Sequence, residues 1–236
     1  MSLIFRPLFE KESSTYTYLL ADSKTKEAII IDAVSETKQR DIGLIEELGL
    51  TLKYIIETHV HADHITSSCP LKEKFTQAQI VLSEANAVAC ADVLIKDGER
   101  LDFGEFNIKA MSTPGHTDGC MSFVVSDKVF TGDALLIRSC GRCDFQGGSV
   151  DKLFNSISKL FTLPDETYVY PAHDYGGRTV SSIWEEKAFN EMIGGGVDKQ
   201  EFVRRVNAME LSLPAKIHVA VPSNQVCGSR IITNKP

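Results

Sequence analysis

The segment THVHADH at residues 58–64 contains three of the chain's six histidines within six positions, together with one aspartate. Imidazole and carboxylate groups are the ligands with which proteins bind Zn²⁺, Fe²⁺ and Mn²⁺. Because side chains alternate between the two faces of a strand, His59 and His61 at a strand end can point into one cavity. Asp63 and His64 follow in the next turn. The segment therefore predicts a metal site, although an aspartate at position 63 can equally cap a helix that begins near Ile65.

Three later segments place further metal-ligand residues at predicted strand ends. STPGHTDG at 112–119 contains His116, FTGDALL at 130–136 contains Asp133, and YPAHDY at 170–175 contains His173. Loops at strand ends are where α/β proteins usually gather functional groups. A single histidine in such a turn is more often a capping or packing residue, but the full set favours a metal site. His218 is the remaining histidine, and we interpret it as an ordinary structural or surface residue.

The elements that must position these residues are short strands and two amphipathic helices. The predicted helices cover residues 35–48 and 149–161. The predicted strands cover residues 15–21, 28–33, 52–58, 79–83, 106–112, 121–126, 128–133 and 167–173. This order predicts two sheets packed face to face with helices outside, an α/β sandwich of four layers. We expect residues 1–236 to form one domain, in which the mostly helical part from about 178 to 236 helps to cover the site.

Composition limits the classes of function. The chain has 236 residues and a net charge of -7, which argues against nucleic acid and anionic membranes as partners. No apolar run approaches the roughly 20 residues that span a bilayer. The N-terminus shows neither a secretory leader nor a transit peptide, so we expect a cytoplasmic protein whose six cysteines are reduced thiols. The C-x-x-C spacing of Cys140 and Cys143 is interpreted as coincidence rather than as a redox pair.

In their order along the chain, THVHADH, GHTDG, TGDA and PAHDY resemble the metallo-β-lactamase fold superfamily. The resemblance implies an αββα sandwich with the metal site at one edge, between the sheets. It leaves the reaction open, because hydrolases of this superfamily such as glyoxalase II bind two metal ions. In that alternative the first metal is held by His59, His61 and His116, the second by Asp63, His64 and His173, and Asp133 bridges them.

The stretch TGDALLIRSCGRCDFQG at 131–147 is more discriminating, and it resembles the persulfide dioxygenase branch, also called the sulfur dioxygenase or ethylmalonic encephalopathy protein family. ESSTYTYLL, PAHDYGGRTVSSIWEEK and AVPSNQVCG resemble the same branch. This chain departs from the usual pattern of the loop at Ser139 and Cys143, where the family has Gly and Thr.

The resemblance implies one Fe(II) per chain, bound by the catalytic residues His59, His116 and Asp133. The reaction would use O₂ to oxidise the terminal sulfur of glutathione persulfide, giving sulfite and glutathione. His61, Asp63, His64 and His173 would then orient the ligands through hydrogen bonds. The resemblance also makes a homodimer plausible. The alternative is a hydroxyacylglutathione (thioester) hydrolase with two Zn or Fe ions; a nuclease is disfavoured by the net charge, and a non-catalytic binding module by the intact ligand set.

Three residues are candidates for binding the glutathione part of the substrate. Glutathione carries carboxylates, so the pocket needs local positive charge, and the planar guanidinium of Arg142 can bind a carboxylate through two hydrogen bonds. Tyr175 is a candidate donor to the peptide, and Asn224 is a weaker candidate in the late VPSNQVCG loop. For each of them the alternative is a role at the surface or in stabilising a loop.

Overall fold

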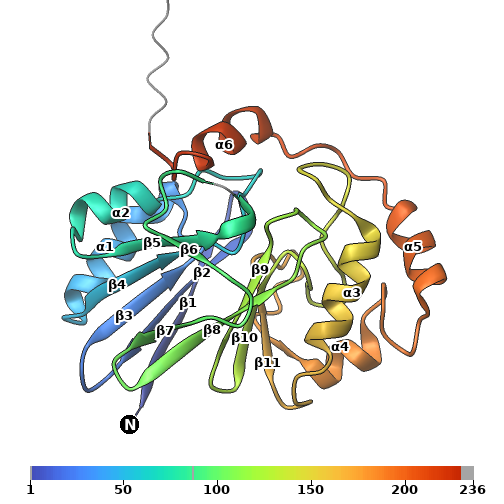
Figure 1. The fold of residues 1–236 in the computed structure, drawn as a ribbon, viewed down its shortest axis with the longest axis horizontal. Helices are drawn as coiled ribbons and strands as arrows, with labels where there is room; N and C mark the ends of the chain where they lie inside the picture. The colour runs from blue at the N-terminus through green and yellow to red at the C-terminus, as the bar shows by residue number, and fades with distance from the viewer. Residues whose placement is uncertain (1, 87, 230–236) are drawn as a thin grey trace, which may run out of the picture.

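Two six-stranded sheets pack face to face, with helices on both outer faces (Figure 1). The structure, a computed structural model, describes residues 2–86 and 88–229. The strand order is β1-β2-β3-β4-β5-β6 in the first sheet and β12-β11-β10-β9-β8-β7 in the second. The predicted four-layer sandwich is therefore confirmed.

The first sheet is built from the N-terminal part of the chain and the second from the part that follows. The first contains β1 (Leu3–Glu10), β2 (Thr15–Asp22), β3 (Glu27–Ile31), β4 (Thr51–Ile56), β5 (Gln79–Ser83) and β6 (Val93–Ile95). The second contains β7 (Arg100–Phe103), β8 (Phe106–Ser112), β9 (Met121–Val125), β10 (Lys128–Gly132), β11 (Tyr168–Pro171) and β12 (Ser181–Ser182). Strands β3 to β6 are parallel, and β10 pairs with β11 in parallel.

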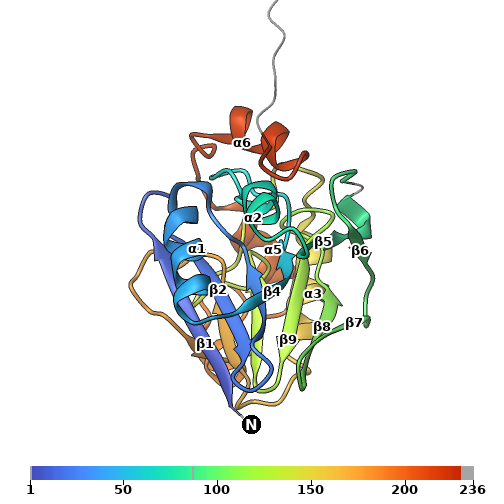
Figure 2. The same ribbon diagram turned by 90° about the vertical axis from the view of Figure 1, so that its left-hand side faces the viewer.

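Helices cover both sheets and one end of the sandwich (Figures 1 and 2). A short 3₁₀ turn (Ser35–Thr37) leads into α1 (Lys38–Glu47), which covers the first sheet together with α2 (Ser68–Lys74). The second sheet is covered by α3 (Val150–Leu160), α4 (Ile183–Phe189) and α5 (Lys199–Asn207). The last helix, α6 (Ile217–Asn224), lies across the end shown at the top of Figure 1. A second 3₁₀ turn spans Glu84–Asn86.

The apolar runs of the sequence are explained by burial on both faces of the first sheet. Tyr18 and Leu20 point into the core between the sheets, whereas Leu19 and Ala21 pack under the helices. A strand in this position needs apolar residues at every step, because neither face meets water. Helix α3 shows the other pattern: Leu153, with Ile157 and Leu160, faces the second sheet, and Ser149 caps the helix by accepting from the Lys152 amide.

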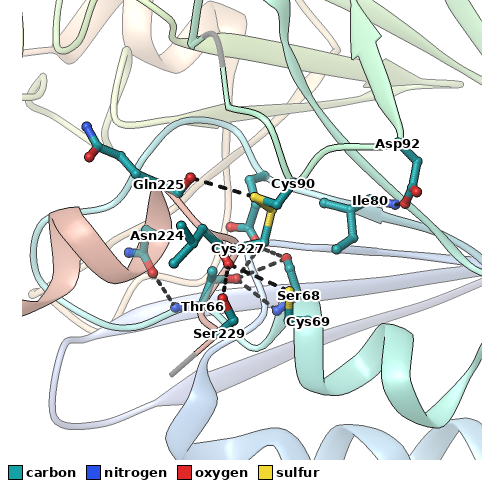
Figure 3. The surroundings of a disulfide bond; sticks show 12 residues. Thr66, Ser68, Cys69, Ile80, Cys90, Asp92, Asn224, Gln225, Cys227 and Ser229 are labelled. Carbon is teal, nitrogen blue, oxygen red and sulfur yellow. Dashed lines mark hydrogen bonds between the residues drawn. A yellow bond between two sulfur atoms is a disulfide. The ribbon is translucent and has the colours of Figure 1, made fainter. Parts of the chain in front are cut away.

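The cysteines differ from the expectation in one respect. Cys90 and Cys227 are joined by a disulfide across 137 residues of sequence (Figure 3), so the prediction of six reduced thiols is wrong for this pair. The remaining cysteines, Cys69, Cys120, Cys140 and Cys143, are free. Spacing in the sequence could not predict the pair, because connectivity depends on which loops the fold brings together. Among the described residues no helix has the length and apolar character that crossing a membrane requires.

Candidate metal centre

Four strands end at the same edge of the sandwich, and each carries a predicted ligand into it. His59 follows β4 of the first sheet, while His116, Asp133 and His173 follow β8, β10 and β11 of the second. The three histidines are buried, and the side chain of Asp133 is 13% exposed. The fold therefore brings together residues that are up to 114 positions apart.

The first candidate group is His59, His116 and Asp133. One ligand atom of each residue lies within 4.8 Å of the others, and the Nε2 atom of His116 is 3.5 Å from Oδ2 of Asp133. The other carboxylate oxygen of Asp133, Oδ1, is buried and has no hydrogen-bond partner among the described residues. Two imidazoles and one carboxylate fit a transition-metal ion, and in this donor set iron and zinc are both acceptable.

The ring orientation of His59 is fixed by Asp32, a residue that the sequence analysis missed. Oγ1 of Thr58 donates to the Asp32 carboxylate at 2.9 Å and lies 3.0 Å from Nδ1 of His59. Because the hydroxyl proton is used on Asp32, the hydroxyl must accept from Nδ1–H of His59. The lone pair of His59 is then on Nε2, where a metal can use it.

His116 is fixed in the same tautomer from another direction. Its Nδ1 atom donates to the carbonyl oxygen of Arg142 at 2.7 Å, because a carbonyl can only accept. Nε2 is therefore the atom that carries a lone pair toward Asp133. The backbone of the loop after β10 thus orients one proposed ligand, while its side chains line the adjacent cavity.

The second candidate group is His61, Asp63 and His173, whose ligand atoms also lie within 4.8 Å of one another. Nδ1 of His173 donates to the Ser14 carbonyl at 3.2 Å, and its Nε2 lies 3.5 Å from Oδ2 of Asp63. His64, which the dinuclear alternative assigned to the second metal, is not a member of this group, and its Nδ1 lies 3.0 Å from Oδ2 of Asp63. Asp63 does not cap a helix, because α2 begins only at Ser68 and Ser67 is its N-cap residue.

A third group contains the buried residues Asp32, Glu57 and His61. Nε2 of His61 is 3.2 Å from Asp32 and 3.4 Å from Glu57, which also accepts hydrogen bonds from Thr66 and Ser68. Neither acid was predicted from the sequence. The available signal was an acidic residue directly after an apolar strand, in AIIID and in YIIE.

The electrostatic surroundings of His59 and Asp63 favour the protonation states that bind metals, whereas nearby carboxylates outweigh burial and raise the pKa of His61 and of His173. Burial lowers the pKa of His59 well below its usual value, and the rings of His61 and His116 lower it further. Burial opposes ionisation of Asp63, but the imidazoles of His64 and His173 outweigh it and hold the pKa of that carboxyl well below its usual range. Neutral imidazole and ionised carboxylate are the forms that act as ligands.

A cavity of about 550 Å³ opens beside the two groups. Its lining includes His116, Asp133 and His173 on the metal side, and Arg142 and Tyr175 among the outer residues. Its size and its mixture of apolar and polar walls are those of a small-molecule site. The edge of the sandwich thus combines a metal-ligand set with an adjoining pocket.

Arg142 lines this cavity, but its guanidinium already has partners. It binds Asp144 through two hydrogen bonds of 2.6 Å each, and donates to the carbonyl oxygens of Leu211 and Ser212. Lys216 is a second cation in the lining that the sequence analysis missed, and its Nζ lies 2.7 Å from Glu36. The only signal for Lys216 was a basic residue in an otherwise apolar stretch, which is too weak to be useful.

Tyr175 lies at the mouth of the cavity and stacks on His173, with ring centroids 5.9 Å apart and planes at 9°. Asn224 lies elsewhere than expected. It is buried and absent from the lining, and its side chain is hydrogen-bonded to main-chain atoms of the histidine loop. It therefore has no atom directed at a ligand in the cavity.

Comparison with known proteins agrees with this geometry. Residues 11–173 match the Metallo-beta-lactamase superfamily. "Persulfide dioxygenase ETHE1, mitochondrial" is 47% identical in Bos taurus and 46% in Homo sapiens, each over 96% of this chain and 89% of the relative. The crystal structure of ETHE1 from Myxococcus xanthus superimposes with a TM-score of 0.92 at 49% identity, covering 95% of this chain and 99% of that one. "Glyoxylase B2" of Dictyostelium discoideum is 31% identical over 92% of this chain and 87% of its own length.

The chain belongs to the metallo-beta-lactamase superfamily. Within that superfamily, the identity and coverage of these relatives place it in the persulfide dioxygenase branch.

Proposed function

We propose that this protein is a persulfide dioxygenase, which uses O₂ and water to convert glutathione persulfide into sulfite and glutathione. The observation that carries the proposal is the group of His59, His116 and Asp133 beside a cavity of about 550 Å³. Two histidines and one carboxylate are the ligand set of non-haem Fe(II) oxygenases, and this set leaves coordination positions open. Bound there, Fe(II) would supply the activation of O₂.

The chain's own residues contribute orientation. Asp32 acts through Thr58, and the carbonyl of Arg142 acts directly, so that both histidines present Nε2 at one point. Such outer contacts hold ligands in their productive orientation and raise their basicity. Leu136 and Ile137 form part of the apolar wall of the adjoining cavity.

For the glutathione part we propose binding by Arg142 and Tyr175. Arg142 is placed in the lining, and its ion pair with Asp144 is an exchangeable contact in which a substrate carboxylate can compete for the guanidinium. Tyr175 offers a phenolic donor at the mouth of the cavity. For Asn224 we propose a structural role instead, because both ends of its amide are used within the protein.

One observation favours a second candidate, a hydroxyacylglutathione hydrolase with two Zn or Fe ions. His61, Asp63 and His173 form a further ligand group next to the first, and Nε2 of His173 is 3.7 Å from Oδ1 of Asp133. In the dioxygenase these residues would orient the first group rather than bind a metal. Metal content distinguishes the two, since about one iron per chain is expected for the dioxygenase and about two metal ions for the hydrolase.

The decisive experiment is O₂ uptake by iron-loaded protein given fresh glutathione persulfide, with sulfite measured in the same sample. Uptake with about one sulfite per O₂, abolished by Asp133→Ala, would support the dioxygenase. The control is S-lactoylglutathione, a thioester substrate. Hydrolysis of the thioester without O₂ uptake would contradict the proposal and favour the hydrolase.

The remaining expectations are proposals as well. We propose one domain over residues 1–236, and the support for a covering role of the C-terminal part is that Met209, Leu211 and Lys216 line the cavity. A homodimer and a cytoplasmic location rest on the resemblance and on the sequence alone. The name "mitochondrial" belongs to the mammalian relatives.

A further inference from the structure

The side chain of Asn224 contacts the back of the loop that carries His61, Asp63 and His64. Its amide nitrogen donates to the carbonyl oxygens of His61 and His64 at 2.9 and 2.8 Å, and its oxygen accepts from the Thr66 amide at 2.9 Å. The residue is 4% exposed. Three hydrogen bonds from one buried side chain fix the course of this loop, because each unmade bond would leave a buried polar group without a partner.

The segment that holds Asn224 also contacts α2 and Thr66 at the end of the same loop. The amide of Cys69 donates to the Cys227 carbonyl at 2.9 Å. Gly228 packs so closely that a Cβ atom there would clash with the Thr66 carbonyl. Figure 3 shows Thr66, Asn224 and Cys227 gathered at this junction.

The covalent contact at this junction is the disulfide between Cys227 and Cys90. Cys90 lies between β5 and β6, so the bond connects the end of the described chain to the first sheet. Non-covalent contacts also hold α6, since Ala220 is buried and Lys216, directly before the helix, lies 2.7 Å from Glu36. Residues 208–216 before it form neither helix nor strand, and Pro222 inside the helix has no N–H to donate.

We propose that Asn224 is a positioning residue for the metal centre, and that the Cys90–Cys227 disulfide keeps it on the histidine loop. The inference rests on the proposed metal-dependent function. With the disulfide formed, the three Asn224 hydrogen bonds hold His61, Asp63 and His64 beside the first ligand, His59. Without it, non-covalent contacts alone hold α6 at the loop, and the ligand geometry loosens.

Low-molecular-weight thiols are the chemical class that would release this contact. One thiolate bonds to Sγ of Cys90, which is more accessible than the buried Cys227, and the bond between the cysteines breaks. A second thiolate then attacks the mixed disulfide on Cys90. The two small thiols leave as a disulfide, and Cys90 leaves as a thiolate. Two thiols are oxidised, both cysteines are reduced, and each cysteine ends with one proton. Glutathione, the thiol product of the proposed reaction, belongs to this class.

The test is the affinity of the apoprotein for Co²⁺, a probe with a visible spectrum that reports ligand geometry. The variants are Asn224→Ala, the isosteric Asn224→Asp, which cannot donate to the two carbonyls, and Cys90→Ser. Cys69→Ser is the matched control, because Cys69 is a free thiol at the same junction. Affinities are compared at a temperature at which circular dichroism shows every variant folded.

We expect the Asn224 variants and Cys90→Ser to bind Co²⁺ about tenfold more weakly with an altered spectrum, and Cys69→Ser to match the wild type. If the Asn224 variants do not fold, the Co²⁺ affinity and spectrum of the wild-type protein are compared before and after a phosphine reduces the disulfide. Equal affinity and spectra in oxidised protein, reduced protein and Cys90→Ser would overturn the proposal. The Co²⁺ measurement involves no persulfide, so its failure is distinguishable from failure of the dioxygenase assay.

Discussion

Nδ1 of His116 lies 2.7 Å from the carbonyl oxygen of Arg142, so a proposed metal ligand and a proposed substrate residue share one hydrogen bond. The contact uses the backbone of Arg142, whereas its side chain is held at the cavity by Asp144 and by the carbonyl oxygens of Leu211 and Ser212. Backbone and side chain of this residue therefore have separate tasks. Substitution of the side chain can test substrate binding without disturbing the ligand.

Arg142→Ala should raise KM for glutathione persulfide about tenfold or more, because a charge-assisted hydrogen bond contributes about 1.5–3 kcal/mol. Iron content should stay unchanged, since the carbonyl that orients His116 remains. Steady-state kinetics and metal analysis on one preparation measure both quantities. Asp144→Asn is the control: it removes the carboxylate that competes for the guanidinium, keeps the contacts to the Leu211 and Ser212 carbonyls, and should leave KM unchanged or lower it. An unchanged KM in Arg142→Ala would remove the residue from substrate binding.

The two ligand groups should respond differently to substitution. Asp133→Ala should lose bound iron and lower O₂ uptake at least about 100-fold, because it removes a direct ligand. His173→Gln should retain about one iron per chain, since His173 belongs to the second group. Metal analysis of each variant, purified in the presence of iron, measures the difference in iron content per chain. If the wild type binds two metal ions per chain and the His173→Gln variant binds one, the assignment of a single iron is wrong.

Gly141 has no room for a side chain. A Cβ atom there would clash with the Asp133 carbonyl and lie 3.0 Å from Nδ1 of His116. Gly141→Ala should therefore lower the free energy of unfolding by about 1–3 kcal/mol, as overpacking does, and weaken iron retention.

Gly43 provides the matched control, because it lies inside α1 with nothing within 4 Å of its added Cβ. Gly43→Ala should raise the free energy of unfolding by about 0.5–1 kcal/mol through helix propensity and leave iron unchanged. Denaturant unfolding and metal analysis compare the two variants. Equal effects of both would show that the space around Gly141 is unimportant.

The Cys143 thiol should react slowly with alkylating reagents. Burial and the Asp144 carboxylate raise its pKa to about 12, so at pH 8 only about one thiol in ten thousand is a thiolate. A raised pKa means that reactivity increases with pH throughout the accessible range. Iodoacetamide labelling followed by mass spectrometry should show a rate that rises about tenfold per pH unit from about pH 7 to pH 10. Free cysteine, the reference, levels off near its own pKa of about 8.5, and similar levelling at Cys143 would contradict the prediction.

Much of the fold and of the ligand set could be predicted from the sequence, because both depend on local pattern. The sequence shows an apolar strand followed by histidine at His59 and by aspartate at Asp133. Because the ends of parallel strands meet at one edge of a sheet, this pattern predicts where the two residues lie. The role of Asp32 could not be predicted, because it depends on the strand register that pairs Ile31 with Ile56 and so brings Asp32 to Thr58. The position of Asn224 depends likewise on a contact across 158 residues.

The proposed centre draws His59 from the first sheet and His116 and Asp133 from the second. The two sheets are made one after the other along the chain, so the order of synthesis has a consequence for metal uptake. A growing chain that has emerged from the ribosome only as far as β6 displays His59 without its partners. The three-ligand set becomes complete only after residue 133 has emerged and the second sheet has docked. Iron must therefore be acquired late, by a sandwich that is already largely assembled.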